Sequence, residues 1–98
     1  MREGSAAEIK NGMKVMARDG DPLGSVTEVL MDEASGIFHG LAVRPNLFTH
    51  DLEVSADHVD ALRDGVVYTD VIQEELEPYY TASERYHEVS EAYSESGV

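Results

Sequence analysis

The pair Asp64-Gly65 lies between two runs of β-forming residues and constrains the fold more than any other feature of this chain. An Asp-Gly pair in this setting is typical of a two-residue type I′ hairpin turn, so residues 66–69 are predicted to form the returning strand. Upstream, Ser55 follows a strand-like run and is a suitable N-cap for a short helical turn. The chain is therefore predicted to turn a sharp corner between two strands.

The first half of the chain predicts three further short strands, separated by turns at Gly20 and Gly36. These strands are expected at residues 13–18, 23–31 and 37–43. In the second of them, Val26 and Val29 would face opposite sides if the strand kept a strict period of two. This mismatch predicts a β-bulge near residues 27–28, and Gly24 fits the same bend.

Ninety-eight residues are enough for one domain, and a hydrophobic content of 42% indicates a folded chain. Close-spaced short strands favour an all-β fold, either a small barrel or a sandwich. Such a small sheet exposes its edges unless it closes or pairs with another chain. We expect a flexible N-terminal tail at residues 1–8, the domain at 9–73 and an acidic helical extension at 74–98.

Two stretches carry a family resemblance. IKNGMKV followed by DGDPLGSV, within residues 9–26, resembles the opening of a PRC-barrel domain, and LEVSADHV followed by DGVV, within 52–67, resembles its closing segment. The resemblance covers about residues 9–72, with Ser55 where the family often has proline. It implies a small, strongly bent antiparallel β-barrel and a stand-alone member of a family that has no shared catalytic residues.

The acidic extension predicts a short C-terminal helix. A capping-box pattern begins at Thr81, and an apolar stripe then recurs at helical spacing. Tyrosine is enriched in interfaces because it combines contact area with a polar tip. The predicted interface residues are Tyr79, Tyr80, Tyr86, Val89 and Tyr93. They could pack on the chain's own barrel, on the second subunit of a homodimer or on another protein, and the sequence leaves these three readings open.

Charge and composition exclude several classes of partner. The formal net charge of −13 opposes binding to nucleic acid and to anionic lipid. No apolar run approaches the length of a membrane span, and the first residues lack the apolar centre of a signal peptide, so we expect a cytoplasmic protein without membrane insertion. The absence of cysteine excludes zinc ribbons and thiol catalysis.

Histidines are the remaining chemical candidates. His50 and His58 flank the strand at residues 52–54, near Asp51 and Asp57, which suggests a small-ligand or metal-binding protein as an alternative function. A metal site needs three or four converging ligands, and no H-E-x-x-H or comparable motif occurs. We therefore expect no catalytic residue, no metal and no cofactor. The favoured function is a non-catalytic protein-interaction module, most simply a homodimer.

Overall fold

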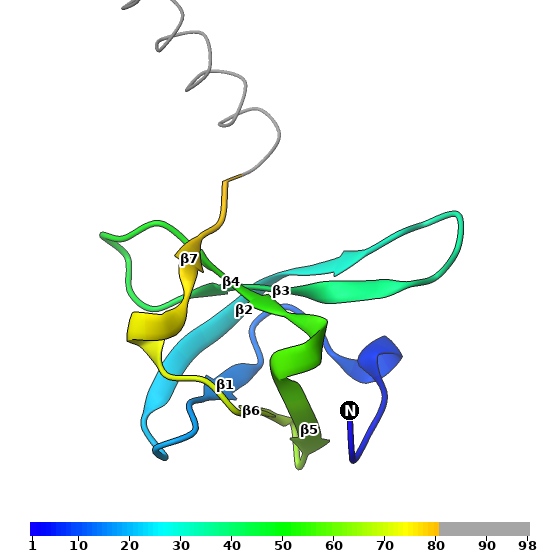
Figure 1. Cartoon of the computed structure of the whole chain (residues 1–98), viewed down its shortest axis with the longest axis horizontal. Coiled ribbons are helices and arrows are strands. Elements are labelled where there is room, and N and C mark those ends of the chain that lie inside the picture. Colours follow the sequence, from blue (N-terminus) through cyan, green and yellow to red (C-terminus); the bar gives the residue numbers. More distant parts are fainter. Residues whose placement is uncertain (81–98) are drawn as a thin grey trace, which may run out of the picture.

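The computed structural model describes residues 1–80, and the residues of the expected C-terminal helix lie outside this described range. The described part is all-β, with short 3-10 turns and no α-helix (Figure 1). The strands are β1 (Lys14–Met16), β2 (Pro22–Met31), β3 (Phe38–Arg44), β4 (Leu52–Ser55), β5 (Val59–Arg63), β6 (Val66–Thr69) and β7 (Glu77–Pro78). The 3-10 turns are η1 (Ala6–Glu8), η2 (Ala56–His58) and η3 (Gln73–Glu75).

The described strands form one sheet in the order β5-β6-β1-β2-β3-β4-β7. Two expectations need correction here. The sheet is not closed into a barrel, because β5 and β7 are its two ends and do not pair with each other. It is also not wholly antiparallel, since β1 runs parallel to β6. The sheet bends around its core, and η2 carries the chain from β4 across to β5 (Figure 1).

The first residues help to explain why the sheet stays open. Residues 1–8 were expected to form a flexible tail, but Glu3 makes a parallel bridge with Ala61 on the outer side of β5. The Leu62 amide donates to the Glu3 carbonyl at 2.9 Å, and the Arg63 guanidinium pairs with the Glu3 carboxylate at 2.9 Å. This arrangement covers one end of the sheet. At the other end, Pro78 limits the pairing of β7 with any further strand, because proline has no amide hydrogen to donate.

The bulge expected in the second strand is confirmed. The register between β2 and β3 shifts between Val26 and Glu28, so an extra residue bends β2. Gly24 has a φ of 140°, and a Cβ atom there would lie 2.1 Å from the Arg44 carbonyl oxygen. Glycine is therefore required at this bend because the next strand's backbone passes too close for any side chain.

The corner around residues 55–65 also forms, with one difference. Asp64 and Gly65 have φ values of 53° and 76°, as a type I′ hairpin between β5 and β6 requires. Ser55 precedes the helical turn η2, but its side chain makes no capping hydrogen bond. The turn is held from its other side, where the Val59 amide donates to the Ala56 carbonyl. The expected turn residues Gly20 and Gly36 lie before β2 and β3, with φ values of 91° and 73°.

Aliphatic side chains from the strands and their connections make up the core. Val15, Leu23, Leu41, Val54 and Val67 are at most 2% exposed and belong to one cluster. Burying a side chain of this kind contributes about 1.5–3 kcal/mol to folding. The core therefore holds β1 to β6 together even though the sheet edges do not meet.

Candidate protein-binding surface

The tyrosines at the end of the described chain pack on the chain's own sheet. The Tyr79 amide donates to the Asp51 carbonyl at 2.7 Å, and its hydroxyl donates to Glu28 Oε2 at 2.7 Å. The Tyr80 ring meets the His50 ring edge-on, with centroids 4.8 Å apart. Of the predicted interface residues, these two therefore brace β7 against β4 and β2. The other three, Tyr86, Val89 and Tyr93, lie outside the described residues.

The structure does not bring His50 and His58 together in one site. The Nδ1 atom of His58 lies 2.8 Å from Asp70 Oδ1, whereas His50 contacts Tyr80. Among residues 1–80, no group of three or more His, Asp and Glu side chains is placed to hold a metal ion. Asp51, expected beside them, instead pairs with Arg44 Nε at 3.0 Å. The two histidines line different hollows of the surface.

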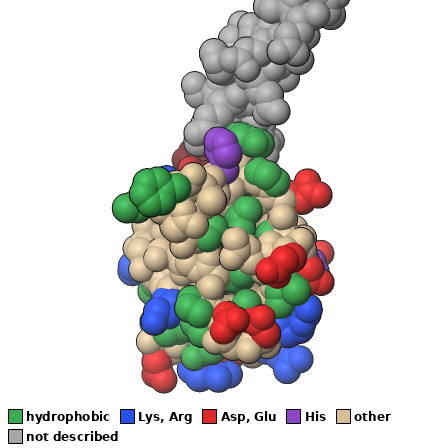
Figure 2. Space-filling view, turned by 90° about the vertical axis from the view of Figure 1, so that its left-hand side faces the viewer, with side chains coloured by type: hydrophobic (Ala, Val, Ile, Leu, Met, Phe, Trp, Pro, Cys, Tyr) green, Lys and Arg blue, Asp and Glu red, His purple; other side chains and the backbone are tan. Residues whose placement is uncertain are grey.

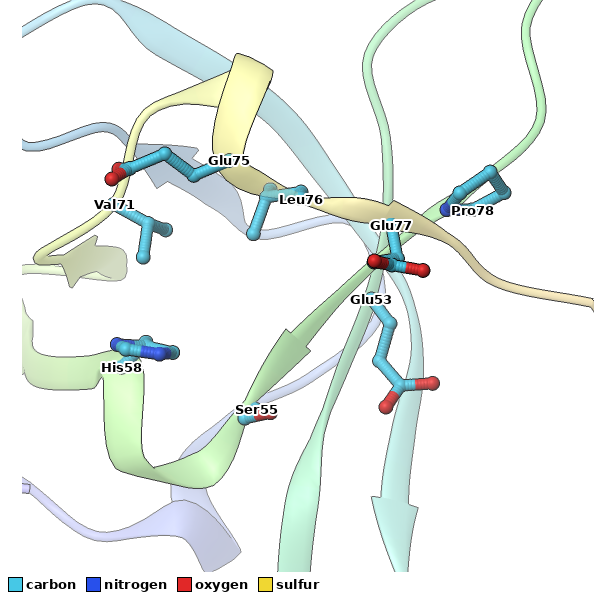
Figure 3. Close-up of a pocket in the computed structure, with 8 residues that line it drawn as sticks. All are labelled: Glu53, Ser55, His58, Val71, Glu75, Leu76, Glu77 and Pro78. Atoms are coloured by element: carbon cyan, nitrogen blue, oxygen red, sulfur yellow. The ribbon is translucent and has the colours of Figure 1, made fainter.

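The first hollow is acidic and has a volume of about 550 Å³. It lies between η2 and the segment that leads into β7 (Figure 3). His58 projects from η2, while Leu76 faces it from the opposite wall. Glu53 and Glu77 are direct partners in the antiparallel pair of β4 and β7, and like charges in such a position oppose each other. The first hollow is therefore polar, and the carboxylates of Glu53 and Glu77 lie on one side of it.

Glu75 also lines this hollow, but its role is structural. Its pKa is lowered chiefly because the Ile72 amide donates a hydrogen bond to Oε1 at 2.9 Å, with Arg18 adding a favourable charge. Arg18 Nη1 lies 3.0 Å from the same oxygen and also donates to the Asp70 carbonyl at 2.8 Å. This carboxylate therefore ties η3 to the turn that follows β1.

The second hollow adjoins two apolar side chains that project into solvent. Leu47 is 84% exposed and Phe48 is 95% exposed, the two highest values among the large hydrophobic residues of the described part. The adjoining hollow has a volume of about 400 Å³. We call these two residues and the hollow the loop surface; the hollow is lined by Pro45, Phe48, Thr49, His50, Leu52, Gln73 and Pro78. In Figure 2, which shows this face of the molecule, apolar side chains form several separate patches, one of which protrudes at the upper left.

The loop that carries Leu47 and Phe48 is braced at its turn and at its base. The Phe48 amide donates to Asn46 Oδ1 at 2.8 Å, a local bond typical of an Asx turn. The ion pair between Arg44 and Asp51 joins the two ends of the loop, and Thr27 Oγ1 donates to Asp51 Oδ2 at 2.5 Å. The two apolar side chains are thus held outward by a fixed turn.

Residues 47–50 lie between two predicted strands, and the strand and turn patterns of the sequence gave no sign that they form a surface of this kind. A usable signal was nevertheless present in the residue types, because Leu-Phe follows Pro-Asn and precedes Thr-His between two strands. Large apolar residues in a turn-forming segment have no regular element that directs them inward. Such a pair is a candidate for exposure and hence for partner contact.

Within residues 1–80, no helix has the length and apolar character of a membrane span.

No curated protein matches the chain significantly. The family model of the PRC-barrel domain matches residues 3–76, about three quarters of the chain. The match begins at the residue that pairs with β5 and ends just before β7, so it spans nearly the whole described sheet. The chain therefore belongs to the PRC-barrel domain family.

Proposed function

We propose that this PRC-barrel domain is a non-catalytic protein-binding module that works in the cytoplasm without a cofactor, and that the loop surface makes the contact. The observation that carries the proposal is the exposure of Phe48 (95%) and Leu47 (84%) beside an apolar hollow. Exposed large apolar side chains that gather in one place are typical of interaction sites. Aromatic residues are also enriched at interface centres.

The shifted ionisable groups support a non-catalytic role. The pKa of Glu3 is lowered by its hydrogen bonds from Arg63, and that of Asp32 by the amides of Ala34 and Ser35. The pKa of Glu75 is lowered in the same way by the Ile72 amide. Each shift has a structural cause in a turn or an ion pair, and the Glu75 carboxylate, which also lines the first hollow, is held by the Ile72 amide and Arg18.

We also propose that the chain forms a homodimer through the predicted C-terminal residues Tyr86, Val89 and Tyr93, apart from the loop surface. Sedimentation velocity on the full chain over a range of concentrations would detect it. The double variant Tyr86→Ser, Tyr93→Ser should weaken the dimer, whereas Phe48→Ser, in the loop surface, is the control that should leave it intact. A single monomeric species at every concentration would remove the homodimer from the proposal.

A photo-crosslinking experiment tests protein binding in general. Benzoylphenylalanine is placed at position 48 of the full chain in the cells that produce it, and the matched control carries it at Ile37. Ile37 is 56% exposed and lies in the β2–β3 connection, away from the loop surface. We expect a protein adduct from position 48 and none of the same mass from position 37. No adduct from position 48 would contradict the proposed function.

A further inference from the structure

We propose that the loop surface docks a cationic segment of another protein, and that this segment inserts an aromatic or large aliphatic side chain into the hollow beside Phe48. The inference rests on the proposed function and adds the chemistry of the partner. It is carried by three observations: the apolar lining of the hollow, the charge of the chain, and the bracing of the loop.

The lining of the hollow selects an apolar anchor. Pro45, Phe48, Leu52 and Pro78 contribute apolar walls, and His50 is the one ionisable side chain among the lining residues. The volume of about 400 Å³ lies within the range of about 300–1,000 Å³ that small-molecule pockets span, so a single large side chain fits. Binding hot spots typically consist of such an anchor in an apolar pocket.

The charge of the chain indicates which kind of molecule supplies this apolar side chain. Residues 1–80 contain sixteen Asp and Glu against six Lys and Arg, a net charge of −10. Next to the lining residues in the sequence are the exposed acids Glu74 and Glu77, the second of which also lines the first hollow, and Arg44, whose charge is paired with Asp51. A cationic segment is attracted to this rim and to the field of the whole chain, and complementary charge speeds encounter between partners.

The same charge disfavours the two nearest alternatives. A second copy of the chain also has a net charge of −13, so charge gives it no attraction to the loop surface. Residues 81–98 of the same chain contain four acids and one Arg, so they are repelled by the acidic rim. A basic segment of a different protein is the occupant that both the apolar lining and the charge favour.

The bracing of the loop lowers the cost of binding. The hydrogen bond from the Phe48 amide to Asn46 and the ion pair of Arg44 with Asp51 hold the loop in shape before any partner arrives. A preorganised surface loses less conformational entropy when it binds. A short segment can therefore gain useful affinity from one anchor and a few basic side chains.

The test is a selection from a displayed library of short random peptides against the full chain. We expect the selected peptides to be richer in Lys and Arg, and in aromatic or large aliphatic residues, than the unselected library. Their affinity should fall at least about tenfold for Phe48→Ser and stay unchanged for the control Ile37→Ser. Affinity should also fall as salt is raised, because salt screens the attraction between the charges. Both substituted side chains are exposed, and matching thermal melts would show that the variants fold.

Four results would overturn the inference: no peptide enriched over the library, enriched peptides without a basic bias, equal binding to Phe48→Ser, or equal loss in Ile37→Ser. These failures differ from failure of the proposed function. If the crosslink from position 48 still traps a protein while the peptide selection fails, the domain binds proteins but its partner is not of this chemistry. If trapped protein proves to be the chain itself, the acidic second copy is the occupant and the cationic partner is refuted.

Discussion

Replacing Gly40 with alanine should strongly destabilise the protein, because two strands meet there backbone to backbone. Gly40 is opposite Ser55 in the β3–β4 ladder and has a φ of 147°. A Cβ atom at this position would lie 2.2 Å from the Val54 carbonyl oxygen, so either β4 must move or the backbone of β3 must change. The conformational strain costs about 1–3 kcal/mol and the forced overpacking about 1–3 kcal/mol.

The sum, about 2–6 kcal/mol, is a large part of the roughly 5–15 kcal/mol that stabilises a domain. Urea unfolding followed by circular dichroism measures it, and with a slope of about 2 kcal/mol/M the midpoint should fall by about 1–3 M. Gly36→Ala is the matched control, since its φ is also positive but nothing lies within 4 Å of the added Cβ. That control should lose only about 1–2 kcal/mol. Equal midpoints for the two variants would refute the close-approach argument.

Three further predictions concern the segment that ends the sheet and the histidines. Tyr79→Phe should cost about 0.5–1.5 kcal/mol in urea unfolding because it removes the hydrogen bond to Glu28, while the matched change Tyr80→Phe costs less; equal losses would contradict this. Glu75→Gln should lower the melting temperature most above pH 4.5, the ordinary pKa of this carboxyl, because the lowered folded-state pKa stabilises the folded protein there. The difference from wild type should shrink as pH falls through that lowered value, and a constant difference would count against the role of Glu75. Titration with zinc should leave the melting temperature unchanged, and a rise that His58→Gln abolishes would restore the metal-binding hypothesis.

Local features were predicted well from the sequence. The hairpin at Asp64-Gly65 and the bulge after Val26 both form, because turn geometry and strand parity depend on a few neighbouring residues. The helical turn after Ser55 forms too, although its serine makes no capping bond. A turn that needs positive φ values accepts few residue types, so the pair Asp64-Gly65 is enough to predict it.

The surface that carries the proposed function could not be predicted in the same way. His50 and His58 look like neighbours of one strand in the sequence, but the sheet places them at different hollows. The sequence left open whether Tyr79 packs on its own chain or on a partner, and the structure shows bonds to Glu28 and Asp51 of its own chain, while its place in an interface stays a prediction. Such contacts join residues far apart in the sequence, and residue type alone does not specify which of several polar groups will meet.

The sequence by itself determined the all-β class, the turns, the bulge and the acidic charge of this PRC-barrel domain, because each depends on residue identity and short-range spacing. The tertiary structure alone decided that the sheet stays open, with Glu3 covering β5 and Pro78 limiting the pairing of β7. It also decided that Phe48 faces solvent beside a hollow. Edge pairing and exposure depend on which distant segments arrive to cover a strand or a side chain, and that is settled only when the whole core has packed.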